Sequence, residues 1–126
     1  MYTPHKYLDQ ALHSKVMALG YTTYGASTFP RVEIHSFDTT PTGAKGDREW
    51  EVTCLLDVIS DSVSPAEADD IIEVLRGGIN ESLSVTGYTV VEVTWEMLNT
   101  SEEIDESTSF IQRRLQRVRF YLHKND

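Results

Sequence analysis

Cysteine is nearly missing from this 126-residue sequence, which contains only Cys54. A single thiol cannot form a disulfide within its own chain, so the fold does not depend on disulfide bonds. This usage fits a reducing compartment. A chain of this length buries most of its apolar surface without disulfide or metal support. We therefore expect one domain spanning residues 1–126.

Long apolar runs are missing as well. No stretch approaches the ~20 consecutive apolar residues that a membrane-spanning helix needs. The first ten residues, MYTPHKYLDQ, lack the apolar central region of a signal peptide. We expect no membrane partner and a protein that is made, or matures, in the cytoplasm.

Positive charge is scarce, with 11 lysines and arginines against 20 aspartates and glutamates, for a net charge of −9. General binding to a nucleic-acid backbone needs a basic surface, so this balance argues against it. The arginine-rich segment near the C-terminus keeps a nucleic-acid-binding module open as an alternative. A salt-dependent shift in the mobility of DNA on adding the protein would favour that alternative.

Patterns typical of catalytic and metal sites are not recognisable. Cys54 lies in an apolar stretch, which predicts a buried and unreactive thiol. The glycines of TGAKGD do not have the spacing of a phosphate-binding loop. The histidines are scattered along the chain, and even His5 and His13, two turns apart on one helix, have no third ligand nearby for a metal ion. The four histidines are His5, His13, His35 and His123. We expect no enzymatic activity, no cofactor and no metal.

Two segments have the apolar spacing of amphipathic helices. Residues 4–20 end at Gly20, which suits the left-handed position after a helix. Residues 64–84 open with a predicted capping box, formed by Ser64 and Glu67. The expected buried stripes are Tyr7, Leu8, Ala11, Leu12, Val16 and Leu19 in the first helix, and Ile71, Ile72, Leu75, Ile79 and Leu83 in the second.

The rest of the chain alternates between apolar and polar residues, as half-buried strands do. The expected strands are 21–25, 30–37, 48–60, 87–98 and 110–123, with a turn-rich loop at 38–47. In the fourth strand we predict Val91, Val93, Trp95 and Met97 on the core side. In the strand 48–60 we predict Asp57 on the solvated face. The core-facing residues expected in the strands 48–60 and 110–123 are Trp50, Val52, Cys54, Leu56, Val58, Val118, Phe120 and Leu122. The fold class is therefore predicted as α+β, with a largely antiparallel four- to five-stranded sheet, two helices packed on one face, and a long hairpin arm.

An acidic block and a basic block stand side by side near the C-terminus. If the last two strands form a hairpin, we expect Glu96 opposite Arg113 and Glu92 opposite Arg117, with an arm at 97–112 projecting from the sheet. The pairs then either decorate a solvated face or contact a neighbouring subunit. The arginines are Arg113, Arg114, Arg117 and Arg119, and the acids before them are Glu102, Glu103, Asp105 and Glu106.

The order and character of these elements resemble the small tail-completion proteins of long-tailed bacteriophages, which include tail terminators and tail-to-head joining proteins. The resemblance rests on an opening helix KYLDQALHSKVMAL, then YTTYG and FPRVEIHSF, the strand REWEVTCLLDVIS, the helix SPAEADDIIEVLRGGINESL, and a closing strand pair ending in VRFYLH. It covers nearly the whole chain. The arm at 97–112 departs from the family pattern.

This resemblance implies a ring of identical subunits, commonly a hexamer, that caps the tail tube and joins it to the head connector. DNA would pass through the ring without being bound, and an acidic lumen would repel its phosphates. The protein would be part of the virion, in the tail or neck, and assemble in the host cytoplasm. A ring with head-to-tail contacts needs two unlike, complementary patches on each subunit. We expect these from the four arginines, with Glu102, Glu103 and Asp105, and from the helix acids Glu67, Asp69, Asp70 and Glu73.

Two further interpretations stay open. One is another virion component, such as a neck, head-closure or tube protein. The other is a small ligand-binding or enzymatic α+β domain, which requires a pocket with converging polar groups.

Overall fold

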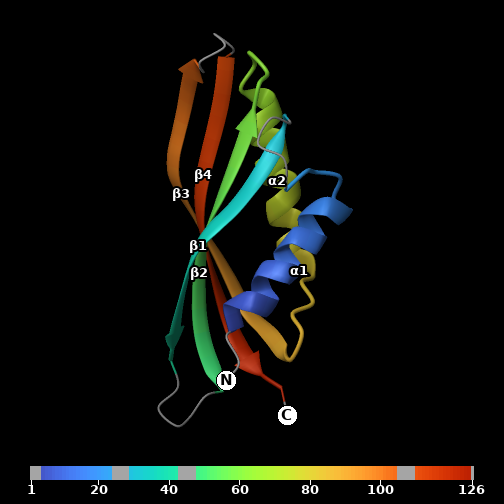
Figure 1. Cartoon of the computed structure of the whole chain (residues 1–126), viewed down its shortest axis with the longest axis vertical. Coiled ribbons are helices and arrows are strands. Elements are labelled where there is room, and N and C mark those ends of the chain that lie inside the picture. Colours follow the sequence, from blue (N-terminus) through green and yellow to red (C-terminus); the bar gives the residue numbers. More distant parts are fainter. Residues whose placement is uncertain (1–3, 24–28, 43–47, 105–109, 126) are drawn as a thin grey trace.

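The computed structural model describes residues 4–23, 29–42, 48–104 and 110–125, and only the backbone of residues 102–104 and 110. Two helices lie on one face of a strongly twisted sheet (Figure 1). In chain order the elements are α1 (Pro4–Ala18), β1 (Arg31–Pro41), β2 (Glu49–Ser60), α2 (Ala66–Glu81), β3 (Tyr88–Ile104) and β4 (Phe110–Lys124).

The sheet has the strand order β1-β2-β4-β3, and every neighbouring pair is antiparallel. Helix α1 packs against β1 and β2, and α2 packs against β2 and β4. This confirms the predicted α+β class and the two helices on one face. Because β2 and β4 occupy the centre, β1 and β3 are the two edge strands.

The core lies between the helices and the sheet. Even-numbered residues of β2 and β4 point toward the helices, as strand alternation predicts. Fully burying one such apolar side chain contributes about 1.5–3 kcal/mol, so this layer supplies most of the stability. Its fully buried members include Leu8, Leu12 and Val16 of α1, Val52 and Leu56 of β2, Leu75 of α2, and Val118, Phe120 and Leu122 of β4.

The elements are close to the predicted ones, with four differences. Strand β3 extends to Ile104, beyond the predicted end at residue 98. Strand β1 runs on to Pro41, because residues 38–41 of the expected loop pair with β2. Of the expected strand 21–25, the described part forms one bridge, between Thr22 and Arg31. The predicted capping box does not close, since the carboxylate of Glu67 accepts a hydrogen bond from Ser60 Oγ at 2.6 Å. Gly20 does have the expected left-handed conformation, with φ 100°.

The predicted hairpin register is displaced by four residues. Glu96 lies opposite Arg117, and Glu92 opposite Tyr121. The described residues form no long projecting arm, because β2 flanks β4 as far as the pair Ser60 and Gln112. A long hairpin arm is therefore not shown, because most of the described part of 97–112 pairs within the sheet. Residues 105–109 of the predicted arm lie outside the described part.

Strand β3 departs from simple alternation at two places. Its pairing with β4 is interrupted between Val90 and Glu92, and again between Met97 and Asn99. Val91 is therefore 64% exposed and Met97 51% exposed, so their predicted core positions were wrong. Val93, between the two interruptions, packs against the core as predicted.

Candidate functional site

The sheet face away from the helices carries arginines on β4, flanked by carboxylates on both neighbouring strands. Each of these arginines has a carboxylate partner in its own chain, which confirms the expectation of cross-strand ion pairs, although with different partners. Exposed pairs of this kind contribute about 0–1 kcal/mol each. The pairs are Arg113 with Asp57, Arg117 with Glu96 at 3.5 Å, and Arg119 with Glu51 at 2.7 Å.

Asp57 differs from the other carboxylates of this face because it is buried. It is 2% exposed, and Ile59, on the same side of β2, is equally buried. The sequence predicted a solvated position for Asp57, and that expectation was wrong. A buried carboxylate needs a charged or hydrogen-bonding partner, and Arg113 supplies it. The fold therefore needs Arg113 as the partner of Asp57, although the Arg113 side chain is partly exposed.

Arg114 points to the opposite face, beneath α2. It is 3% exposed, and its Nε donates a hydrogen bond to Asp69 Oδ1 at 2.8 Å. Its Nη1 donates to the carbonyl oxygen of Arg113 at 2.9 Å and contacts Gln112 Oε1 at 3.4 Å. The basic block therefore divides between the two faces of the sheet, and Arg114 connects β4 to the first turn of α2.

The helix acids expected at a subunit interface lie in the first half of α2. Asp69 already pairs with Arg114, while Asp70 and Glu73 of α2 are exposed. Glu102 and Glu103 pair through their backbones with β4, and their side chains lie outside the described part. Asp105 lies outside the described residues altogether. Contact of these groups with a neighbouring subunit stays a prediction.

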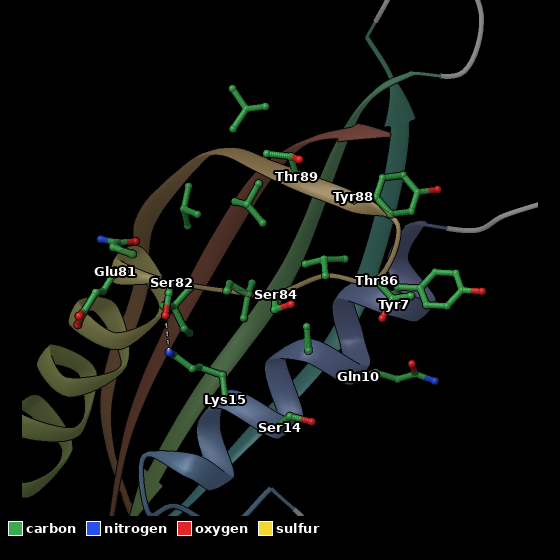
Figure 2. A pocket seen from close by; sticks show the side chains of 18 of the residues that line it. Tyr7, Gln10, Ser14, Lys15, Glu81, Ser82, Ser84, Thr86, Tyr88 and Thr89 are labelled. Carbon is green, nitrogen blue, oxygen red and sulfur yellow. Dashed lines mark hydrogen bonds between the residues drawn. The ribbon is translucent and has the colours of Figure 1, made fainter. Parts of the chain in front are cut away.

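A groove of about 1060 Å³ opens between α1, the segment after α2 and the first half of β3 (Figure 2). Its floor includes Ile79, Val85 and Tyr88, all buried. Much of its wall is uncharged and polar, with the cation Lys15 donating to Ser82 Oγ at 3.1 Å. The polar lining includes Gln10, Ser14, Ser84, Thr86 and Thr89.

The groove follows the free edge of β3 rather than one of its faces. Residues 88–93 all line it, and successive strand residues point to opposite faces, so the groove lies along the edge. The chain turns at Gly87, whose φ is 82°, and Tyr88 N donates to Val85 O at 3.0 Å. The segment 82–86 and β3 then diverge, and the groove lies along both.

The sequence did not predict this groove. It showed no cluster of polar residues that would line a pocket, because the lining comes from α1 and from residues 79–93, which lie far apart in the chain. One local signal was present. The segment SLSVTG, residues 82–87, is rich in hydroxyl side chains and ends at a glycine, which is typical of a turn between exposed extended segments.

Cys54 is buried beneath the helices, as predicted. Burial, with a smaller contribution from the charge of Asp9, raises the pKa of its thiol from 9.0 to about 12. The described residues hold no cluster of three or more His, Cys, Asp or Glu side chains that suits a metal ion. Among the described helices, none is both long enough and apolar enough to cross a membrane.

Comparison with known proteins identifies a similar fold in a virus-like particle. Neither protein-family models nor curated protein sequences match the chain. A solved structure described as the virion of a native gene transfer agent particle contains a chain that matches with a TM-score of 0.70 and 15% sequence identity. The match covers 98% of this chain and 99% of that chain. The two proteins therefore share one fold over their whole lengths.

Proposed function

We propose that this protein is a structural subunit of a phage-like virion, and more specifically a tail-terminator or tail-completion protein. The observation that carries the proposal is the fold shared with a gene transfer agent virion chain over 98% of this protein and 99% of the other. The sequence resemblance to tail-completion proteins points independently to the same class of assembly protein.

In this role the subunit forms a ring, commonly a hexamer, at the end of the tail tube and joins the tube to the head connector. The protein is then a structural part of the tail or neck and not an enzyme. It assembles into the virion in the host cytoplasm. DNA passes through the ring without specific binding. The net charge of −9 supports this, since an acidic protein surface repels phosphates and limits nonspecific adhesion.

The charged residues supply candidate contacts between subunits. Arg117 keeps 44% of its side chain exposed although it pairs with Glu96, so a neighbouring carboxylate can still reach it. Asp70 and Glu73 form an exposed acidic surface on α2. Arg114 belongs to the fold of its own subunit, because it is buried against Asp69. Unlike patches on one subunit suit head-to-tail ring contacts.

The groove favours a second function, that of a ligand-binding domain. Its volume of about 1060 Å³ and its polar wall over an apolar floor are compatible with a bound molecule. Another neck or head-closure protein is a third possibility within the virion class. The two virion roles are distinguished by the size of the ring and by the virion proteins that the ring binds.

The mass of the purified protein in solution tests the proposal. Light scattering after gel filtration, over a range of protein concentrations at low and high salt, should show conversion to one closed ring of defined mass. Electron microscopy of that fraction should show rings with an open centre, and the rings should bind tail tubes in preference to unrelated filaments. A monomer at every concentration that binds a small molecule in the groove would contradict the ring proposal.

A further inference from the structure

Both edges of the sheet present backbone groups that no other strand of the described chain pairs with. Strands β1 and β3 each have a single neighbour. Among the described residues, the outer edge of β1 is paired only at its start, where Val32 N donates a hydrogen bond to Thr22 O at 2.9 Å. Residues 33–41 of β1 and 90–99 of β3 therefore leave one edge open. An exposed edge strand is a template for pairing with another chain.

We propose that residues 33–41 of one copy pair in antiparallel fashion with residues 90–99 of the next copy, so that the sheet continues from subunit to subunit around the ring. This inference rests on the cyclic assembly proposed above and identifies the contact that makes it. The partner is a second copy of this chain, and the main attraction comes from backbone hydrogen bonds between two edge strands.

Strand directions within the subunit suit this contact. Each neighbouring pair in the order β1-β2-β4-β3 is antiparallel, so the two edge strands run in opposite directions. Rotation about an axis along the strands keeps these directions. The β3 edge of one copy therefore meets the β1 edge of the next in the antiparallel sense, and all subunits pair in the same way.

The two edges also lie at the same level along the strands. Cross-strand pairing connects β1 to β3 through β2 and β4. Each residue of 33–41 that pairs with β2 therefore has a counterpart in the same row of β3, while Ser36 and Phe37, in the irregularity of β1, have none. Rotation about an axis along the strands brings these counterparts together. Three such rows are His35, Leu55, Arg117 and Glu96; Thr40, Glu51, Tyr121 and Glu92; and Pro41, Trp50, Leu122 and Val90.

Charge is complementary in this alignment. The carboxylates of β1 meet neutral side chains of β3, and the β1 imidazole meets a carboxylate with which it can form a hydrogen bond. No two carboxylates face each other among these positions, and avoiding such pairs matters because like charges directly opposite destabilise a sheet. The facing residues are Glu33 with Asn99, His35 with Glu96, and Asp38 with Thr94.

The alternative contact, between the β3 edges of two copies, is less favourable. Antiparallel pairing of this strand with itself brings Glu92 and Glu96 of one copy near the same residues of the other. Strand β3 has no lysine or arginine between Tyr88 and Ile104 to offset their repulsion. Charge therefore favours the unlike contact, which is the one that a ring requires.

The groove leaves room for the incoming strand. It lies along the β3 edge at residues 88–93, where the segment 82–86 and α1 stand away from the strand. In the aligned copy, Thr39 and Pro41 belong to the helix-facing side of β1, because their partners Val52 and Trp50 do. Their side chains would enter the groove over its apolar floor. The empty space along the edge thus becomes part of the subunit contact.

Disulfide trapping in the full chain tests the proposal. Directly opposite residues in neighbouring antiparallel strands have Cα atoms about 4.5–5.5 Å apart, which a disulfide can bridge. Thr40→Cys with Glu92→Cys should therefore give, under mild oxidation, a reducible ladder of covalent oligomers that ends at the size of the ring. The variant with Thr40→Cys and Thr94→Cys should give the ladder instead if the pairing between copies is shifted by two residues. All three positions are exposed, and circular dichroism checks that the variants fold.

Thr40→Cys with Glu73→Cys, on the exposed side of α2, is the matched control and should give no ladder. Rings without a ladder from either strand pair would overturn the edge contact and leave the ring proposal intact. A ladder that stops at a dimer, or that runs on without closing, would support the edge contact and contradict the ring. Monomers throughout, with no ladder, would overturn both.

Discussion

The guanidinium of Arg114 is buried beneath α2 and donates a hydrogen bond to Asp69 at 2.8 Å, although that carboxylate is itself 59% exposed. A buried cation on the central strand is thus matched by an anion at the surface. The pair holds the first turn of α2 against β4, and the negative charge also suits a helix N-terminus. An uncompensated charge in this position would be costly.

Asp69→Asn should therefore lower the free energy of unfolding by about 1–3 kcal/mol, because it leaves the buried Arg114 without a charged partner. Urea unfolding followed by fluorescence measures the change. Asp70→Asn, at the next position of the same helix turn, is the control and should change stability by about 0.5 kcal/mol or less. Equal effects at both positions would show that the pair does not hold the helix.

Two adjacent glycines of α2 should respond differently to alanine. A Cβ on Gly77 would meet no atom within 4 Å, so Gly77→Ala should stabilise by about 0.5–1 kcal/mol through helix propensity. A Cβ on Gly78 would lie 2.7 Å from Leu19 Cδ1, so Gly78→Ala should gain less or destabilise. Thermal unfolding measures both.

The double variant Leu19→Ala with Gly78→Ala separates the two contributions. If the contact with Leu19 limits the gain, the two substitutions will not be additive, because each changes the effect of the other. The same gain for Gly77→Ala and Gly78→Ala would contradict the close packing of α2 on the chain segment after α1.

Cys54 should resist thiol reagents in the native protein at pH 8, since burial raises its pKa from 9.0 to about 12 and keeps the thiol protonated. Unfolding should expose it to full labelling. The buried, protonated thiol contributes fully to the free energy of unfolding below pH 9. This contribution is lost as the pH rises from 9 toward 12, because the thiol loses its proton at lower pH in the unfolded chain than in the folded one. Rapid labelling of the folded chain would contradict its burial.

Arg117→Gln should weaken ring assembly while leaving the subunit folded, if this exposed arginine contacts a neighbour as proposed. Its pair with Glu96 is exposed, so the free energy of unfolding should change by about 1 kcal/mol or less. Light scattering gives the concentration at which half of the protein assembles. Arg119→Gln is a second variant on the same face. Arg113 and Arg114 are unsuitable, since their loss leaves Asp57 or Asp69 without its partner.

Unchanged assembly of folded Arg117→Gln and Arg119→Gln variants would remove these arginines from the subunit contact. Their role would then be confined to the cross-strand pairs within one chain. That result would leave the edge-strand contact as the remaining basis for a ring.

Most elements were predictable because their signals are local. The apolar spacing of α1 and α2 and the alternation of β2 depend on residues within a few positions of each other. The even-numbered residues of β2 and β4 were correctly predicted to face the core. Cys54 was correctly predicted as buried for the same reason, since Val52 and Leu56 flank it on one face of the strand.

Strand pairing, in contrast, depends on residues far apart in the chain. The predicted hairpin register was wrong by four residues. A shift of the pairing by any even number of residues keeps Glu92 and Glu96 on the outward face, so alternation alone does not select one register. Insertion of β4 between β2 and β3 selects one of the possible registers. The same insertion pairs most of the described part of the expected arm within the sheet. Alternation along β4 then places Arg114 on the face opposite to Arg113, Arg117 and Arg119.

Local periodicity therefore determined by itself the α+β class, the two helices and the inward face of each central strand, since these follow from which side chains avoid water. Only the tertiary structure decided the strand order, the bulges that expose Val91 and Met97, the pairing of Arg114 with Asp69, and the groove along β3. The physical reason is that each of these depends on which distant segments become neighbours, and the free energy that selects them comes from packing and backbone pairing across the whole sheet.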